Sequence, residues 1–221
     1  MTIKPRPAGR IFEALHSTAV RDTAGLREIY EQPSDMATRK AVDRLHDVAR
    51  AFIARSSLLF VASAGADGSC DVTPRGGPAG FVSVLDEFTL AIPDATGNRR
   101  LDTLHNIVET GRAGLIFLVP GQASTLRVNG RACVSTDPRL LEQLTPVGKA
   151  PRSAIVVEAE DVYQHCPKAF LRGNAWKPGE WLPADAVPSS AAITLAHLDI
   201  PGLTVEQVRE YERESLLHRY E

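Results

Sequence analysis

The feature that most constrains the fold is a series of short stretches with alternating apolar residues between positions 57 and 163. Turn signals rich in glycine, aspartate or proline separate these stretches, and a period of two is typical of strands that are buried on one side. The stretch 113–119 is apolar on both faces and therefore predicts a central strand. Strands are predicted at residues 58–63, 70–75, 81–84, 88–92, 113–119, 125–134 and 154–160.

At least six of these strands follow one another through hairpin-type turns, with few helices between them. This pattern predicts a mainly β fold with flanking helices, in which the strands form a small antiparallel barrel. Pro74 has no N–H group to donate, so the strand that contains it is expected at a sheet edge or at a bulge.

Helices are predicted on both sides of the strand region. Residues 1–56 are expected to be helical, with a short helix near 26–30. After Ser34 as N-cap, apolar residues at helical spacing predict one amphipathic helix of about five turns; these residues are Ala41, Leu45, Val48, Phe52 and Ile53. Near the other end, Thr204 and Gln207 form a capping box that predicts a last helix.

Arg99 and Arg100 follow a strand that ends in Pro93-Asp94, and they are predicted to lie in the first turn of a crossover helix that ends near Gly111. Cations are disfavoured there, because the free N–H groups already make that end of a helix positive. Two arginines at this place therefore predict a bound anion, and a phosphate suits backbone N–H groups and guanidinium forks together. The alternative is an ordinary solvated turn with two surface arginines.

A second polar feature lies on the strand 125–134, where four polar residues share one face: Thr125, Arg127, Asn129 and Arg131. Such a face predicts either contact with solvent or contact with a polar ligand. The sequence leaves these two interpretations open.

Composition excludes several classes of protein. The formal net charge is −2, so no global basic field predicts nucleic-acid binding. Three widely spaced cysteines without a CxxC pair argue against a disulfide framework or a cysteine zinc site, and no metal site is expected. No apolar run approaches the ~20 residues of a membrane span, and no signal-peptide core is present, which predicts a cytoplasmic protein.

Four motifs in order resemble the FMN-binding split-barrel superfamily typified by pyridoxamine 5′-phosphate oxidase, and within it the bacterial oxidase-related flavoproteins of unassigned substrate. They are Val72-Thr73-Pro74-Arg75-Gly76, Ile92-Pro93-Asp94, Gly97-Asn98-Arg99-Arg100-Leu101, and the stretch from Thr125 to Ala132. The resemblance covers about Arg55 to Tyr163. It implies an antiparallel split β-barrel and a homodimer with an FMN site at each side of the subunit interface.

The resemblance also implies roles for individual residues. Arg75 and the Gly-Asn-Arg-Arg turn would hold the flavin phosphate, Thr125 would make a polar contact to the flavin, and backbone groups of Ile92 and Pro93 would run beside the ring. The His165-Cys166-Pro167-Lys168 segment and Trp176 would close the site from the second subunit, although Trp176 also suits interface packing. The candidate cofactor contacts are Thr73, Arg75, Ile92, Pro93, Asn98, Arg99, Arg100, Thr125, Arg127, Lys168 and Trp176.

On this basis we expect a single domain over 1–221, with a helical extension at 1–56, the barrel at 57–163 and an interface segment at 164–221. The chain lacks the Arg-Leu-Ala-Pro-like tail and the Arg-x-His pair of true pyridoxamine-phosphate oxidases, so oxidation of vitamin B6 is not expected. An FMN-dependent oxidoreductase of unknown substrate is the first prediction; because a flavin carries the redox chemistry, no catalytic residue is predicted. The alternatives are a non-catalytic flavin- or haem-binding protein and a deazaflavin-dependent reductase.

Overall fold

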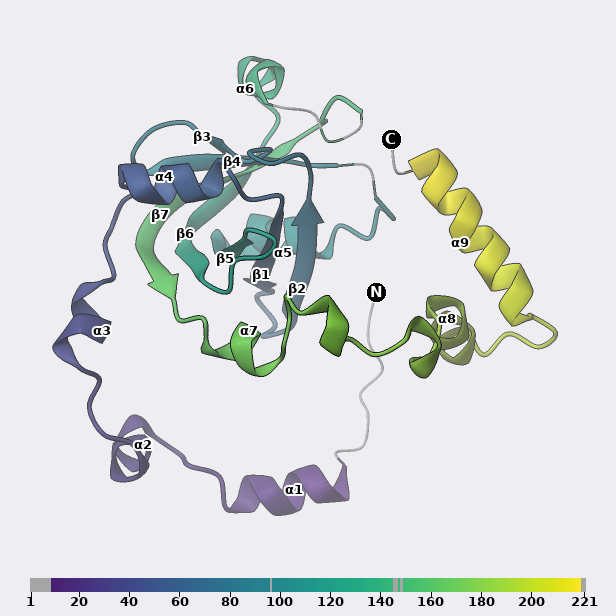
Figure 1. Ribbon diagram of the computed structural model, residues 1–221, viewed down its shortest axis with the longest axis horizontal. Coiled ribbons are helices and arrows are strands. Elements are labelled where there is room, and N and C mark those ends of the chain that lie inside the picture. The colour runs from purple at the N-terminus through teal and green to yellow at the C-terminus, as the bar shows by residue number, and fades with distance from the viewer. Residues whose placement is uncertain (1–8, 96, 145–146, 148, 220–221) are drawn as a thin grey trace. The chain divides into compact units, whose positions relative to one another are not determined.

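The computed structural model describes residues 9–95, 97–144, 147 and 149–219. Within them, seven strands form one sheet in the order β2-β1-β5-β6-β7-β4-β3, and every neighbouring pair is antiparallel (Figure 1). The strands are β1 Leu58–Ala64, β2 Cys70–Gly76, β3 Ser83–Val84, β4 Thr89–Pro93, β5 Arg112–Leu118, β6 Thr125–Ser135 and β7 Ala154–His165. The predicted mainly β architecture is confirmed, and a curved sheet whose two edge strands do not pair fits a split barrel.

The described residues also form helices. They are α1 Arg10–Ser17, α2 Thr23–Ile29, α3 Asp35–Arg39, α4 Asp47–Ile53, α5 Asp102–Thr110, α6 Pro138–Gln143, α7 Lys168–Arg172, α8 Ser190–Leu198 and α9 Val205–Arg219, with 3₁₀ turns at Pro178–Glu180 and Ala184–Ala186. In the described part of the chain, no helix is both long enough and apolar enough to cross a lipid bilayer.

The core lies on one face of the sheet, where alternate residues of the strands are buried as their period of two predicts. The largest fully buried side chains on the strands are Leu59, Val61, Leu90, Ile92, Leu115, Phe117, Val128 and Ile155. Each such side chain contributes about 1.5–3 kcal/mol when it leaves water, so this face supplies most of the driving force for folding.

Helix α5 is fastened to the β1–β2 hairpin by polar contacts as well as by apolar packing. The Thr103 hydroxyl donates to Asp71 at 2.5 Å, and the buried Asn106 amide donates to the Ser63 hydroxyl at 3.1 Å. The helix ends at Gly111, which has a φ of 67° and donates its N–H to Ile107 at 2.8 Å. The predicted glycine cap is therefore confirmed.

The prediction of a single long helix after Ser34 was wrong. The Ser34 hydroxyl does accept from Ala37, but α3 ends at Arg39 and the chain then runs extended until α4 begins at Asp47. In the extended part, Val42 and Val162 exchange two backbone hydrogen bonds of 3.0 and 2.7 Å, and Leu45 is fully buried. The backbone groups of Val42 thus form hydrogen bonds with Val162 on β7 in place of the helical hydrogen bonds that the pattern predicts.

The chain divides into two units, residues 1–39 and 40–221. In the first unit, the described helices α1 to α3 bury no side chain. In the second unit, the predicted capping box of α9 is confirmed, because Thr204 and Gln207 donate their backbone N–H groups to one another's side chains at 2.9 and 3.2 Å. Residues 220 and 221 of the tail lie outside the described residues.

The irregularity in the β6–β7 ladder falls at Asn129 and Gly130, and it provides a test of the fold. A Cβ atom on Gly130 would lie 1.8 Å from the Glu158 carbonyl oxygen, so the two backbones can approach only because glycine has no side chain. We expect Gly130→Ala to lower the free energy of unfolding by about 1–3 kcal/mol, as overpacking does elsewhere. Urea unfolding measures this change.

The matched control is Gly179→Ala, because a Cβ at Gly179 would meet no atom within 4 Å. That control should leave stability within about 0.5 kcal/mol of the wild type. Equal stability of the two variants would show that the close approach at Gly130 is not a constraint.

Candidate functional site

Arg75 occupies a half-buried position on the edge strand β2, on the face that turns toward the core. Its Nη1 atom lies 3.3 Å from Oδ1 of Asp94, at the end of β4, and both side chains are 22% exposed. The Arg75 Nε atom is buried and has no hydrogen-bond partner among the described residues. A buried donor without an acceptor costs about 1–3 kcal/mol, so this guanidinium is set to receive a further acceptor such as an anion.

The carboxyl group of Asp94, beside Arg75, is poorly stabilised in its charged form. Burial raises the pKa of Asp94 above its ordinary value, and the charge and hydrogen bond of Arg75 only partly offset this effect. The environment therefore disfavours the charged form of Asp94. An incoming anion would compete for Arg75 with a carboxylate that is itself poorly stabilised.

The predicted position of Arg99 and Arg100 in the first turn of a helix was wrong. Helix α5 begins at Asp102, and Leu101 caps it with a φ of 61°. The side chain of Asn98 accepts the N–H of Arg100 at 3.0 Å, which holds the arginines in a turn before the helix. An acidic residue takes the first helical turn instead, as the positive end of the helix favours.

This turn nevertheless has features of an anion site. Arg99 also has a φ of 61°, so two bulky residues around Arg100 adopt the left-handed conformation, which costs energy and is concentrated at functional sites. The Nε atom of Arg100 pairs with Asp102 at 2.8 Å, whereas Arg99 has no ion-pair partner among the described residues. Thr96, in the same turn, lies outside the described residues. No described contact joins Arg75 to either arginine.

The apolar candidates lie where only their backbone can reach a ligand. The side chain of Ile92 is 1% exposed and that of Pro93 is buried, and β7 pairs with this strand on one side. On the other side, the described pairing of β3 ends at Ala91. Among the described residues, no strand pairs with Ile92 and Pro93 on that side, which suits the predicted backbone contact. Thr73 is half-buried on the same face of β2 as Arg75.

Candidates from the second polar strand face divide into two groups. Arg131 pairs with Glu158 and with Glu160 at 3.7 Å, and the Asn129 amide donates to Asp161 at 2.9 Å. These two side chains therefore find partners within the chain. By contrast, Thr125 is buried opposite His165, and Arg127 contacts no carboxylate among the described residues.

The segment after β7 is packed against the β5–β6 loop of the same chain. The Trp176 ring stacks on Phe170 with centroids 5.9 Å apart, and its Nε1–H donates to the Gln122 carbonyl at 2.8 Å. Lys168 begins α7 and is exposed. These contacts of Trp176 lie within one chain, and its predicted place at a subunit interface stays a prediction.

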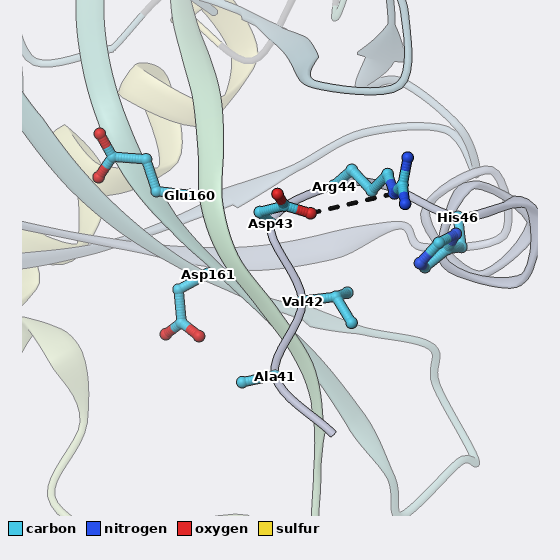
Figure 2. Close-up of a pocket in the computed structure, with 7 residues that line it drawn as sticks. All are labelled: Ala41, Val42, Asp43, Arg44, His46, Glu160 and Asp161. Atoms are coloured by element: carbon cyan, nitrogen blue, oxygen red, sulfur yellow. Dashed lines mark ion pairs between the residues drawn. The ribbon is translucent and has the colours of Figure 1, made fainter. Parts of the chain in front are cut away.

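Two open hollows in the described part of the chain contain none of the predicted cofactor contacts. One, of about 430 Å³, lies between the extended segment after α3 and β7, and Figure 2 shows its lining: Ala41, Val42, Asp43, Arg44, His46, Glu160 and Asp161. The other, of about 740 Å³, lies among β3, α6 and the end of β6. Among the described residues, no three histidine, cysteine or acidic side chains are placed to hold a metal ion.

The sheet order, the unpaired edges and the residues on β2, β4 and β6 define an antiparallel split β-barrel. Residues 45–166, more than half of the chain, match the family model described as pyridoxamine 5′-phosphate oxidase. The protein therefore belongs to the pyridoxamine 5′-phosphate oxidase family. No curated protein matches the sequence.

Solved structures that resemble the chain include HupZ from Group A Streptococcus, which is 18% identical, with 52% of this chain and 89% of that chain covered and a TM-score of 0.42. An FMN-binding protein from Syntrophomonas wolfei is 14% identical, with 71% and 97% covered and a TM-score of 0.38. An F420 reductase is 16% identical, with 53% and 93% covered and a TM-score of 0.35. Identities this low do not carry function from those proteins to this chain.

The perturbed carboxyl beside Arg75 yields a pH-dependent prediction. Because the pKa of Asp94 is raised in the folded protein, its contribution to stability is fully present below the ordinary pKa of an aspartate and is lost as the pH rises through the folded value. Asp94→Asn removes this titration. We expect the variant to gain stability relative to wild type as the pH rises from about 4 to 7, measured by urea unfolding.

The control is Asp86→Asn, since hydrogen bonds, first of all from the Phe88 N–H, lower the pKa of Asp86. Its contribution is present above the ordinary pKa and is lost as the pH falls, so this variant should lose stability relative to wild type as the pH rises. The same pH trend in both variants would contradict the assignment of opposite shifts.

Proposed function

We propose that the protein binds FMN and is an FMN-dependent oxidoreductase that acts on a small molecule. The observation that carries the proposal is the buried Nε of Arg75, a donor without an acceptor among the described residues, on the barrel edge of a family member. An FMN phosphate carries up to two negative charges at neutral pH and three strong acceptor oxygens, and it would supply the missing acceptor.

Different residues of the chain would bind the phosphate and the ring of the cofactor. Arg75 and the guanidinium of Arg99 would bind the phosphate, while the turn held by Asn98 presents them. Backbone groups of Ile92 and Pro93, with Thr73 and Thr125, would orient the ring. The bound cofactor would supply electron transfer to or from the substrate, which the protein orients and shields from side reactions.

We propose further that two copies of the chain form a homodimer with FMN at the interface. The outer face of β1 and β2 supports this proposal, because Phe60, Ala62, Val72 and Pro74 are exposed side by side on it. Apolar faces of this kind are usually covered in the functional assembly. Lys168 and Trp176 of one subunit would then stand at the site of the other.

The flavin proposal predicts a specific loss in Arg75→Gln. We expect the variant to bind FMN about 10- to 100-fold more weakly, because a hydrogen bond to a charged group is worth about 1.5–3 kcal/mol. Flavin absorbance after loading with FMN measures binding. Arg112→Gln is the matched control, since it removes the same charge from an exposed ion pair with Glu160 at 2.7 Å.

Full FMN occupancy in Arg75→Gln would place the phosphate elsewhere. For the wild type, anaerobic bleaching of bound flavin by NADH or NADPH supports an oxidoreductase. A stable yellow protein that neither nucleotide nor any amine substrate reduces would instead support a passive flavin-binding protein. A haem-like absorbance in place of flavin would overturn the choice of cofactor.

The dimer proposal predicts dissociation in Val72→Asp. Val72 is 65% exposed in the single chain, and an unpaired carboxylate in a buried interface costs on the order of 3 kcal/mol. We expect the dissociation constant of the dimer to rise about 100-fold, as seen by light scattering over a range of concentrations. Val48→Asp is the control, at an 82% exposed position on α4. A monomeric wild type that still holds flavin would contradict the proposal.

A further inference from the structure

The two segments that form the paired ends of β6 and β7 contain no acidic residue. The chain has 27 aspartates and glutamates, yet none occurs in residues 119–136 or in residues 162–179. The β6–β7 ladder brings these two segments side by side, with Thr125 opposite His165 and Arg127 opposite Tyr163. Figure 1 shows β7 leading from this point into α7, whose segment adds further basic residues. The two segments therefore bring basic residues together on a protein with a net charge of −2.

At the pairing of these two segments lies a cluster that we call the Tyr163 corner, which consists of Lys40, Arg127, Tyr163 and His165. The Nη1 atom of Arg127 donates to the Tyr163 hydroxyl at 2.6 Å. The Lys40 Nζ and the Arg127 Cζ lie 5.5 and 5.7 Å from the centre of the Tyr163 ring. The His165 ring stacks on the same tyrosine at 6.2 Å.

The charges of this corner are not neutralised within the described part of the chain. Other arginines of the sheet, Arg75, Arg112 and Arg131, each pair with a carboxylate. Lys40 and Arg127 have no carboxylate partner among the described residues. The acid closest in sequence on β7, Asp161, already accepts from the Asn129 amide at 2.9 Å.

The corner also presents hydrogen-bond donors that have no acceptor among the described residues. Because the Tyr163 hydroxyl oxygen accepts from Arg127, its own proton is left to donate outward, and no described residue receives it. The Lys40 ammonium uses one hydrogen for the Gln164 carbonyl at 2.9 Å and keeps two more. Several donors and two positive charges without an acceptor are what an oxyanion requires.

We propose that the Tyr163 corner binds the oxyanion group, a carboxylate or a phosphate, of the small-molecule substrate. The proposal rests on the proposed function, since it places an acidic substrate beside the flavin contact expected at Thr125. Arg127 and Lys40 supply the charge, and the Tyr163 hydroxyl fixes the direction of approach. This site is separate from Arg75, which lies on β2 at the far side of β1 and β5 in the strand order.

The test is a titration of FMN-loaded, ¹⁵N-labelled protein with inorganic phosphate and, separately, with succinate, at constant ionic strength. Bound FMN occupies the Arg75 site, so new shifts report a different site. We expect saturable shifts of the Gln164 and His165 backbone amides with at least one of the two anions. The anion that binds more tightly identifies the substrate group as a phosphate or as a carboxylate.

Two variants and two matched controls sharpen the test. Tyr163→Phe should weaken the anion about tenfold, which corresponds to about 1.4 kcal/mol, and Arg127→Gln should weaken it at least as much. Tyr163→Phe should retain the wild-type ratio of flavin to protein absorbance. Tyr30→Phe removes an exposed hydroxyl, and Arg131→Gln removes the same charge from an ion pair on the same strand, so both controls should bind the anion as wild type does.

Absence of shifts at Gln164 and His165 with both anions overturns the proposal, as does unchanged affinity in Tyr163→Phe. Loss of flavin from Tyr163→Phe would also overturn it, because the corner would then hold the cofactor. If the wild type holds no flavin, the proposed function fails. The same titration then tests anion binding at the Tyr163 corner by itself, because phosphate at the Arg75 site would shift amides of β2 and not those of β7.

Discussion

The long antiparallel pairing of β6 with β7 is the interaction on which the rest of the structure depends. Strand β6 joins β7 to β5 and β1, while β7 joins β6 to β4 and, through Val162, to the extended segment at Val42. Gly130 allows the two backbones to approach at the irregularity in this ladder. The same pairing buries Val128 in the core and brings Arg127 to Tyr163. The pairing of β6 with β7 therefore positions both the core and the Tyr163 corner.

The distribution of charge over the sheet separates structural from functional side chains. Arg112 on β5 and Arg131 on β6 pair with Glu158 and Glu160 on β7, and exposed pairs of this kind contribute little energy and need no ligand. Two places differ among the described residues. Arg75 keeps a buried donor without an acceptor, and Arg127 keeps its charge without a carboxylate. Both lie on a family barrel that would hold an anionic cofactor and its substrate.

Much of the fold could be predicted, since the signals for it are local. The strands, the turn before Arg112 and the capping box of α9 depend on residues within a few positions of each other. The arginine turn illustrates the limit of this reasoning. Arg99 and Arg100 were expected inside the helix, but with the Asn98 turn and a left-handed Leu101 the helix begins at Asp102, two residues after Arg100. Side-chain capping competes with helix propensity, and the sequence pattern does not decide between them.

By itself, the sequence determined the mainly β architecture, the order of the hairpins, the family motifs and the two caps, because periodicity and turn chemistry act along the chain. Only the tertiary structure decided that the residues between α3 and α4 run extended, since the partner of Val42 is a backbone group on β7. It likewise decided which cations remain unpaired in the described part of the chain. Arg127 and Tyr163 are 36 residues apart, and only the register of two paired strands determines that they meet.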